Sequence, residues 1–319
     1  MALLILIFLI LHFGVGLMMP YRPAVKPYYY RLMHDAGLDL DRRLNRAERP
    51  QSVRIVRGAA VGLLTGGLAA ALGEALYYAG RTPYGLLLQL IFLACCVNFM
   101  MPVKVVRQVL ADIGDLPRAK AVLQPYFEEP LEHVDGHTVI RKTITFMALS
   151  FNKFLLAPVF WLLAAGPVGM ALCVTYAALR DAFGLPDKRR KYFGQFVRGA
   201  DILMNIIPAA IGAFFIMVGG IFVRRVNPWN DMILALKQCA RAGLAYQDWL
   251  VIAMASGLGV MLGGAVRYSE DYVNNTPWFG AQDAPARLEP ENLLQAQQSQ
   301  YFFILFITVM ISIFMIGGM

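Results

Sequence analysis

Long apolar stretches, separated by short charged segments, dominate the pattern of this 319-residue chain. Five of them are almost free of charge and approach the roughly 20 residues that a helix needs to cross a bilayer. The first has no basic start and no small-residue cleavage site, which favours an uncleaved membrane anchor over a signal peptide. The pattern therefore predicts about five crossing helices, at residues 2–19, 58–79, 84–103, 202–222 and 301–319. The short turn 80–83 makes the second and third a helical hairpin.

Residues 154–178 form a further apolar stretch of 25 residues, with Pro158 near its start and Pro167 in its middle. A straight helix would lose backbone hydrogen bonds at both prolines. The next segment, 180–198, has six Lys or Arg against two acids, which is typical of a cytoplasmic loop. A single crossing would place this loop outside the cell. We therefore expect a re-entrant hairpin that turns at Gly166-Pro167.

Charged segments between the apolar stretches show helical periodicity. Residues 22–57 carry nine Lys or Arg against four acids and predict a basic cytoplasmic loop. Residues 104–150 are mixed in charge and predict a cytoplasmic helical segment. The expected helical parts of the charged segments are 38–57, 105–113, 116–126 and 230–242.

The apolar run 249–266 is at the short end for a crossing helix and is unusually rich in glycine. Glycines lower helix stability and let backbones approach closely. The loop that follows, 267–300, has two basic against five acidic residues and does not require a cytoplasmic side. The orientation of residues 223–300 therefore stays open. The glycines of the run are Gly257, Gly259, Gly263 and Gly264.

Composition agrees with this pattern, since 58% of the residues are hydrophobic and 16% are charged. The net charge of +8 could indicate nucleic acid, but basic cytoplasmic loops explain it, so membrane lipid is the expected partner. Four Cys and four His lack ligand or disulfide spacing, and no metal site is predicted from them. The predicted fold class is all-α: one polytopic membrane domain over 1–319, with re-entrant hairpins and cytoplasmic amphipathic helices.

Several short motifs occur in the second half of the chain. Leu258-Gly259-x-x-Leu262-Gly263-Gly264 is followed by Tyr268 and by Pro277-Trp278-x-Gly280. This arrangement resembles the C-terminal signature of the CobD/CbiB cobalamin-biosynthesis membrane proteins, of which the AmpE protein is a distant relative. Gly114-Asp-Leu-x-x-Ala-x-x-x-Leu123 and Ala157-Pro158-x-Phe160 are also similar to that family. The resemblance covers residues 104–280, with a core at 151–280, and implies a multi-pass protein of the bacterial inner membrane.

The resemblance implies an activity, a set of cofactors and a set of ligand-binding residues. The family joins adenosylcobyric acid and aminopropanol phosphate by forming an amide bond, with ATP and Mg²⁺. The corrinoid would then be a substrate of this chain. The residues carried over by the motifs, or placed beside them, are Asp181, Tyr192, Arg198, Asp201, Asn205, Tyr268 and Trp278.

The chain departs from the family pattern at charged positions. Lys153 and Phe154 stand where the family has Asp-Gly, and Ile202 replaces the second acid of an Asp-Asp motif. Holding Mg²⁺ and controlling phosphate charge require carboxylates, so these changes remove candidate ligands. Two functions stay open: a cobalamin-biosynthesis enzyme, or a non-catalytic AmpE-like signalling or scaffold protein that binds a partner. A transporter fits less well, because the chain shows no inverted repeat.

Individual residues also have two interpretations. Asp201 and Asn205 are four apart on one helix face, so they are either a remnant substrate site or a helix-end ion pair with Arg198 or Lys191. Lys153 before an apolar segment predicts a snorkelling anchor. Interface anchoring is also expected for Trp278 and for the aromatic run Tyr28 to Tyr30.

Overall fold

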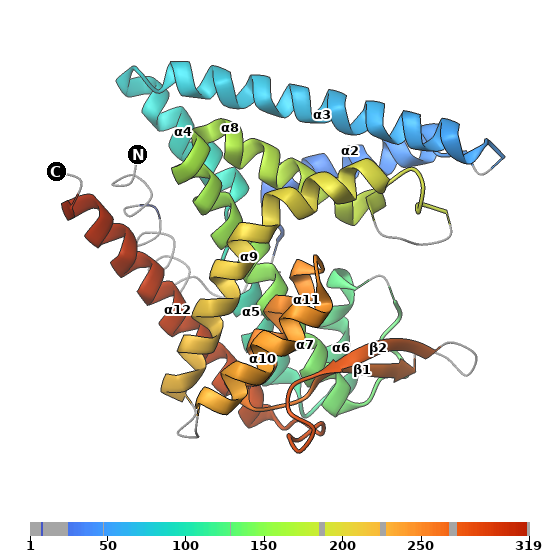
Figure 1. Cartoon of the computed structure of the whole chain (residues 1–319), viewed down its shortest axis with the longest axis vertical. Coiled ribbons are helices and arrows are strands. Elements are labelled where there is room, and N and C mark those ends of the chain that lie inside the picture. Colours follow the sequence, from blue (N-terminus) through green and yellow to red (C-terminus); the bar gives the residue numbers. More distant parts are fainter. Residues whose placement is uncertain are drawn as a thin grey trace. The chain divides into compact units, whose positions relative to one another are not determined.

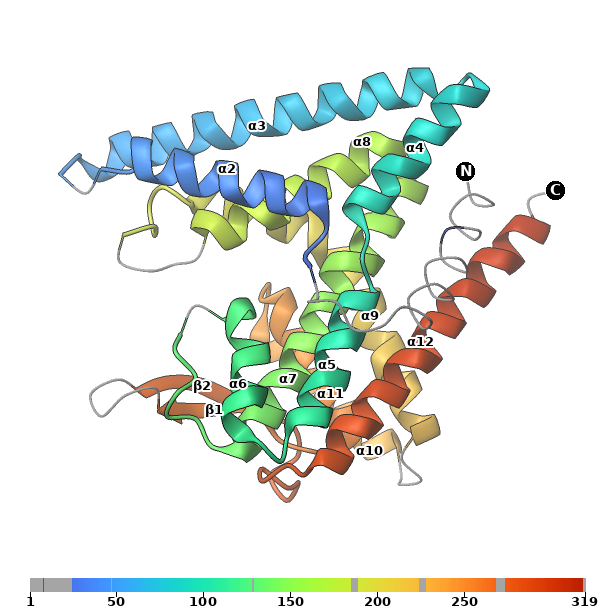
Figure 2. The same cartoon turned by 180° about the vertical axis from the view of Figure 1, so that it is seen from behind.

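The computed structural model describes residues 8, 25–46, 48–127, 129–184, 189–223, 228–267 and 273–317. These residues are helical apart from loops and one two-stranded sheet (Figure 1, and from behind in Figure 2), which confirms the predicted helical membrane fold. The predicted anchor at 2–19, apart from residue 8, lies outside the described residues, as does Tyr268. The α-helices are α2 Tyr28–Leu44, α3 Gln51–Ala79, α4 Pro83–Cys96, α5 Met100–Asp112, α6 Leu116–Leu123, α7 Gly136–Phe151, α8 Ala157–Leu179, α9 Gln195–Val223, α10 Pro228–Ala242, α11 Tyr246–Leu258 and α12 Pro290–Gly317.

Shorter elements lie between the α-helices. A 3₁₀ turn, η1 (Gln124–Tyr126), follows α6, and π-helical turns η2 (Asn152–Leu156) and η3 (Arg180–Gly184) flank α8. Strands β1 (Leu262–Arg267) and β2 (Val273–Phe279) form the sheet.

Four helical segments of the described residues are long and apolar enough to cross a membrane by length and composition. They are Gln51–Ala79, Tyr84–Asp112, Gly136–Gly184 and Gln195–Gly220. The chain is therefore a polytopic membrane protein.

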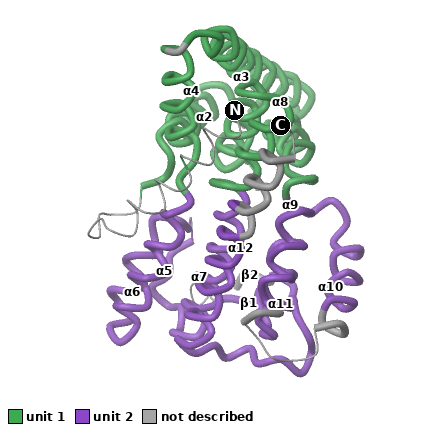
Figure 3. The backbone as a smooth tube through the Cα atoms, turned by 90° about the vertical axis from the view of Figure 1, so that its left-hand side faces the viewer, with its two compact units in different colours: residues 1–11, 25–98, 153–208 green, residues 12–24, 99–152, 209–319 purple. Residues whose placement is uncertain are grey.

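The described residues form two compact units, coloured separately in Figure 3. Unit 1 contains residues 25–98 and 153–208, and unit 2 contains residues 99–152 and 209–317. Helix α9 contributes its part up to Pro208 to unit 1 and the rest to unit 2.

In unit 1, helix α3 has a small-residue face and a leucine face. Gly58, Gly62 and Gly66 lie four residues apart and are buried against neighbouring elements, because helical residues four apart share a face. Leu64 and Leu68 on the other side are 69% and 73% exposed, as expected for side chains that face lipid. The glycine face lets the backbone of α3 approach its neighbours closely.

Helix α8 of unit 1 is bent back on itself at Gly166, which has φ 64° and ψ −160° (Figure 1). A Cβ atom built on Gly169 would lie 2.9 Å from the carbonyl oxygen of Trp161. In a straight helix, residues eight apart are separated by about 12 Å. Pro167 opens the second arm, where its missing N–H is tolerated. The predicted reversal at Gly166-Pro167 is confirmed, and its cytoplasmic placement stays a prediction.

Three predicted helices have different bounds. The expected helix 38–57 is interrupted between Leu44 and Gln51, because Pro50 disfavours helical backbone in the residue before it. The expected crossing helix 84–103 ends at Cys96, where Val97 adopts extended backbone with φ −112° and ψ 127°. The helix predicted from 301 begins at Pro290.

Unit 2 contains a core built on α5 and α7. Helix α5 was predicted to be amphipathic, and Val105, Val106 and Val109 of its apolar stripe are buried. Helices α6 and η1 match the predicted short helix 116–126, and α10 matches the predicted helix 230–242.

The glycine-rich run 249–266 of unit 2, which is at the short end for a crossing helix, is not a single helix. Helix α11 ends at Leu258, and Gly259 caps it in the left-handed conformation with φ 61°. The chain then forms β1, which pairs with β2 in antiparallel register with Leu262 opposite Phe279. Gly263 and Gly264 have φ values of 79° and 82°, which a helix cannot accommodate. The strands were therefore missed because the pattern was interpreted by hydrophobicity alone.

Candidate functional site

A cluster of buried charges lies in unit 1, where the two ends of the bent α8 meet α2 and α9. We call it the acid cluster. Its members are Tyr30 on α2, Lys153 in η2, Arg180 and Asp181 in η3, and Asp201 and Asn205 on α9. Both π-helical turns carry a charged member, and such turns often mark functional positions because their extra residue redirects side chains.

Asp181 is surrounded by donors. The Lys153 ammonium and the Tyr30 hydroxyl both contact its Oδ2 atom, and Arg180 Nη1 lies 3.9 Å from Oδ1. Burial, with the negative charge of Asp181 next, raises the pKa of Tyr30 well above its ordinary value. The phenol therefore stays protonated and donates to the carboxylate.

Asp201 is fully buried, and Arg180 and Asn205 of the same unit contact its carboxylate. Arg180 Nε lies 3.2 Å from its Oδ2 atom, and Asn205 Nδ2 donates to Oδ1 at 2.9 Å. Asn205 also donates to the carbonyl oxygen of Asp201 at 3.1 Å. A buried carboxylate is strongly unfavourable without such a partner, so Arg180 is required by the fold around Asp201.

Two carboxylates and two cations make the acid cluster formally neutral. Arg180 lies between the acids, with Nε toward Asp201 and Nη1 toward Asp181. The four charges therefore form one connected network rather than two separate pairs.

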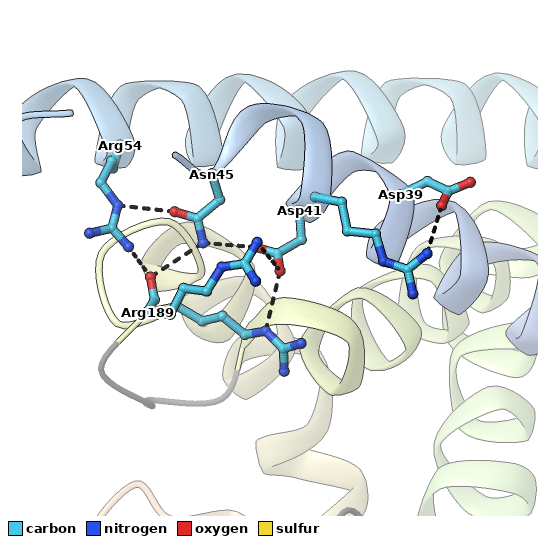
Figure 4. A network of polar contacts seen from close by, with 7 residues as sticks. Asp39, Asp41, Asn45, Arg54 and Arg189 are labelled. Atoms are coloured by element: carbon cyan, nitrogen blue, oxygen red, sulfur yellow. Dashed lines mark hydrogen bonds and ion pairs between the residues drawn. The ribbon is translucent and has the colours of Figure 1, made fainter. Parts of the chain in front are cut away.

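A second polar network lies in unit 1, where the end of α2, the start of α3 and residues 189–198, a loop and the first turn of α9, meet (Figure 4). We call these elements the basic corner. Asn45 Nδ2 donates to Asp41 Oδ1 at 2.7 Å, and Arg54 Nε donates to Asn45 Oδ1 at 3.0 Å. The Arg54 guanidinium also donates to the carbonyl oxygen of Arg189.

Two arginine side chains also lie within ion-pair distance of the Asp41 carboxylate. Arg190 Nε and Arg189 Nη2 lie 3.4 Å and 3.8 Å from its Oδ2 atom. Asp41 is only 2% exposed, so its carboxylate is buried. Its ion pairs with Arg189 and Arg190 hold the loop that contains them against α2.

Tyr192 and Arg198 belong to this corner. The Arg54 guanidinium lies 5.8 Å from the centroid of the Tyr192 ring, and Arg198 Nη2 donates to the carbonyl oxygen of Lys191 at 2.9 Å. The cation that the structure places on Asp201 is Arg180, which the sequence reasoning did not consider.

Trp278 lies in unit 2, on β2. A Cβ atom on Gly264 would come within 2.3 Å of its indole ring, and the Arg141 guanidinium lies 4.8 Å from the ring centroid. The Gly-Gly and Pro-Trp parts of the C-terminal motif therefore pack directly against each other. Trp278 is 44% exposed, so part of its ring faces the surroundings.

The sequence reasoning missed the roles of Lys153 and Tyr30. Lys153 was expected to snorkel, but it is an ion-pair partner, and Tyr30 was expected at the interface, but it is 1% exposed. A signal was present in the sequence. Lys153 lies 14 residues before Pro167 and Asp181 lies 14 residues after it, so a hairpin turning there brings the two together.

The fold and the acid cluster define a polytopic helical membrane protein with a bent helix whose two ends are joined by an ion pair between Lys153 and Asp181. The family described as CobD/Cbib protein matches residues 13–299, and the chain belongs to that family.

Curated relatives share the name "Cobalamin biosynthesis protein CobD". The chain is 26% identical to the one from Sinorhizobium sp over 244 residues, which cover 73% of this chain and 76% of that protein. It is 27% identical to the one from Clostridium perfringens over 55% of each chain, and 29% identical to one from Rhodobacter capsulatus over 52% of this chain and 51% of that protein. The match thus spans about half the length of the latter two relatives. No solved structure matches.

The acid cluster does not fit the Mg²⁺ that the resemblance implies. Oxygen atoms that a magnesium ion would coordinate are contacted by Lys153 and Arg180, which carry the same sign of charge as the ion. Among the described residues, no group of three or more His, Cys, Asp or Glu is arranged to hold a metal.

Proposed function

We propose that this chain is a non-catalytic membrane protein of cobalamin biosynthesis, which binds a corrinoid or a protein partner and does not form the amide bond itself. The observation that carries the proposal is the ion pair between the ammonium group of Lys153 and the carboxylate of Asp181. The names of the relatives support the pathway, and the charges of the acid cluster support the loss of ATP-dependent chemistry.

Activating a carboxylate with ATP requires Mg²⁺ to bridge phosphates and protein carboxylates. Asp181 and Asp201 are the acids available in the cluster, and each already has a cation of the chain within ion-pair distance. A magnesium ion would have to displace these side chains or approach them against repulsion, so the cluster favours a structural or binding role.

Complementation tests the proposal. The gene is expressed in a strain that lacks adenosylcobinamide-phosphate synthase, on a medium without cobinamide where growth requires cobalamin. We expect no growth although the protein reaches the membrane in normal amount, which an epitope tag and membrane fractionation would measure. Growth at the rate given by the authentic synthase would overturn the proposal.

A binding measurement tests the proposed binding role. Purified protein in detergent is titrated with a cobinamide or a cobyric acid, and the corrinoid absorbance bands are followed. We expect saturable binding without ATP or Mg²⁺. If neither corrinoid binds and no membrane protein co-purifies with the tagged chain, the binding role is wrong.

The amide-forming enzyme is the second candidate. It is favoured by the family match over residues 13–299 and by the close packing of Gly264 against Trp278 within the family motif. Release of phosphate from ATP, dependent on both substrates and on Mg²⁺, would favour this candidate over the first.

A further inference from the structure

The basic corner carries a dense positive charge. Residues 39–57 and 189–198 contain ten Lys or Arg against three acids. One acid, Asp41, is buried within the corner, and another, Asp39, forms an exposed ion pair with Arg42 at 3.6 Å. The cations that face outward therefore exceed the acids that could neutralise them. The exposed ones among the described residues include Arg43, Arg46, Arg189 and Lys191.

The corner is held in a defined shape. Asn45 donates both to Asp41 and, at 3.3 Å, to the carbonyl oxygen of Arg189, so one buried amide joins α2 to the loop. Close packing supports the same junction, because a Cβ atom on Gly58 would lie 1.8 Å from the carbonyl oxygen of Phe193. The backbone positions that carry the exposed cations on either side of this junction thus keep a fixed spacing.

The corner also lies at the N-terminal end of the exposed apolar face of α3, on the side of this helix away from its glycine face. Val56 in the first turns of α3 is 67% exposed, and Leu63 and Leu64 continue this exposed apolar surface along the same helix. A basic cluster at the start of a lipid-facing apolar surface lies at the depth of lipid headgroups.

We propose that the basic corner is a binding site for anionic phospholipid, with Arg43, Arg46, Arg189 and Lys191 on the headgroup phosphates. The side chains attract the negative surface, and the adjacent apolar face of α3 takes the acyl chains. Asp41 positions Arg189 and Arg190 through ion pairs, and its own negative charge is buried, away from the lipid phosphates. This site is independent of the proposed function and rests on a separate network.

Lipid binding to the purified full-length protein in detergent tests the site. Fluorescently labelled phosphatidylglycerol is titrated, with labelled phosphatidylcholine as the neutral comparison, at low and at high salt. We expect a clear preference for phosphatidylglycerol that weakens with salt, because exposed charges are screened.

The variant R43Q/R46Q/R189Q/K191Q should lower the affinity for phosphatidylglycerol at least tenfold, since each basic residue near an anionic surface contributes about fivefold. A control with the same change in net charge is R107Q/R118Q/K237Q/R241Q, whose four side chains are exposed in unit 2. The control should keep the affinity within about twofold of the parent.

A further variant separates charge from folding. R43K/R46K/R189K keeps all four charges at the corner and should bind phosphatidylglycerol nearly as well as the parent. The proposal is overturned if the glutamine variant binds like the parent, or if the control loses affinity equally. It is also overturned if millimolar inorganic phosphate displaces the labelled lipid, because the corner would then be a site for soluble phosphate.

Discussion

Two glycine-rich segments of this protein have similar compositions and different structures. Helix α3 of unit 1 remains a helix of 29 residues, although glycines recur along it. The run after Trp249 in unit 2 ends its helix at Leu258 and becomes a β-hairpin. Glycine content by itself therefore does not say whether an apolar segment crosses a membrane as a helix.

The difference follows from spacing and from what the glycines contact. In α3, Gly58, Gly62 and Gly66 stand on one face and let other backbones and rings approach, with no need for unusual backbone angles. In the hairpin, Gly263 and Gly264 are adjacent and have positive φ, where an L-residue with a side chain is strained. The glycines of α3 thus allow close packing, and the glycines of the hairpin allow the backbone angles that the strand requires.

The largest effect is expected for Gly58→Ala. The new methyl group would meet the carbonyl oxygen of Phe193 at 1.8 Å, and this backbone cannot move without disturbing the basic corner. We expect destabilisation of about 3 kcal/mol or more and a large loss of folded protein after extraction. Yield of monodisperse protein on size exclusion and the midpoint of thermal unfolding measure it; an unchanged midpoint would show that the α3 contact is loose.

Gly264→Ala should have the next largest effect. It combines a φ of 82° with a contact of 2.3 Å to the Trp278 ring, so strain and overpacking add to about 2 to 3 kcal/mol. Because the disturbance is local, hydrogen exchange should become faster in strands β1 and β2 and stay unchanged in α3. Equal acceleration in α3 would contradict the separate roles of the two glycine sets.

Gly259→Ala should cost less, about 1 kcal/mol, through the strain that a side chain has in the left-handed conformation of this residue (φ 61°). Gly259→Asn should recover part of that loss, since asparagine tolerates this conformation. Thermal unfolding of the two variants side by side measures the difference. If alanine and asparagine were equally harmful, the backbone angle would not be the cause.

Gly67→Ala should have the smallest effect, and of the opposite sign. A Cβ atom there would meet nothing within 4 Å, and alanine favours the helix over glycine by about 0.5 to 1 kcal/mol. The unfolding midpoint should rise slightly. This variant is also the matched control for Gly58→Ala, because both add one methyl group to the same helix; a fall at position 67 would mean that the helix is held by more than its glycine face.

Much of the helical pattern was predictable. The turn at 80–83, the reversal at Gly166-Pro167 and the short helices near 116–126 and 230–242 follow from apolar periodicity and from the limits that proline and glycine place on the backbone. The helix bounds near Pro50 and Val97 were harder to predict from the sequence, because one depends on a single proline and the other on an extended residue inside an apolar run.

Of the candidate site, Asp201 with Asn205 was predicted correctly as a pair on one helix face, because the four-residue spacing makes it local. The partners of the acids were not predicted. Arg180 contacts Asp201 over 21 positions of sequence, and Tyr30 reaches Asp181 from a different helix over 151 positions. Such contacts depend on which helix faces meet.

By itself, the amino-acid sequence determined that this is a helical membrane protein of this family, with a chain reversal at Gly166-Pro167 and a basic loop after it. These properties arise from hydrophobicity, charge and backbone limits that act over a few residues. Only the tertiary structure decided that Lys153 and Arg180 bind the two acids, and that Gly259 turns an apolar run into a hairpin. Ion pairs and strand pairing depend on packing between distant segments, which a linear pattern does not contain.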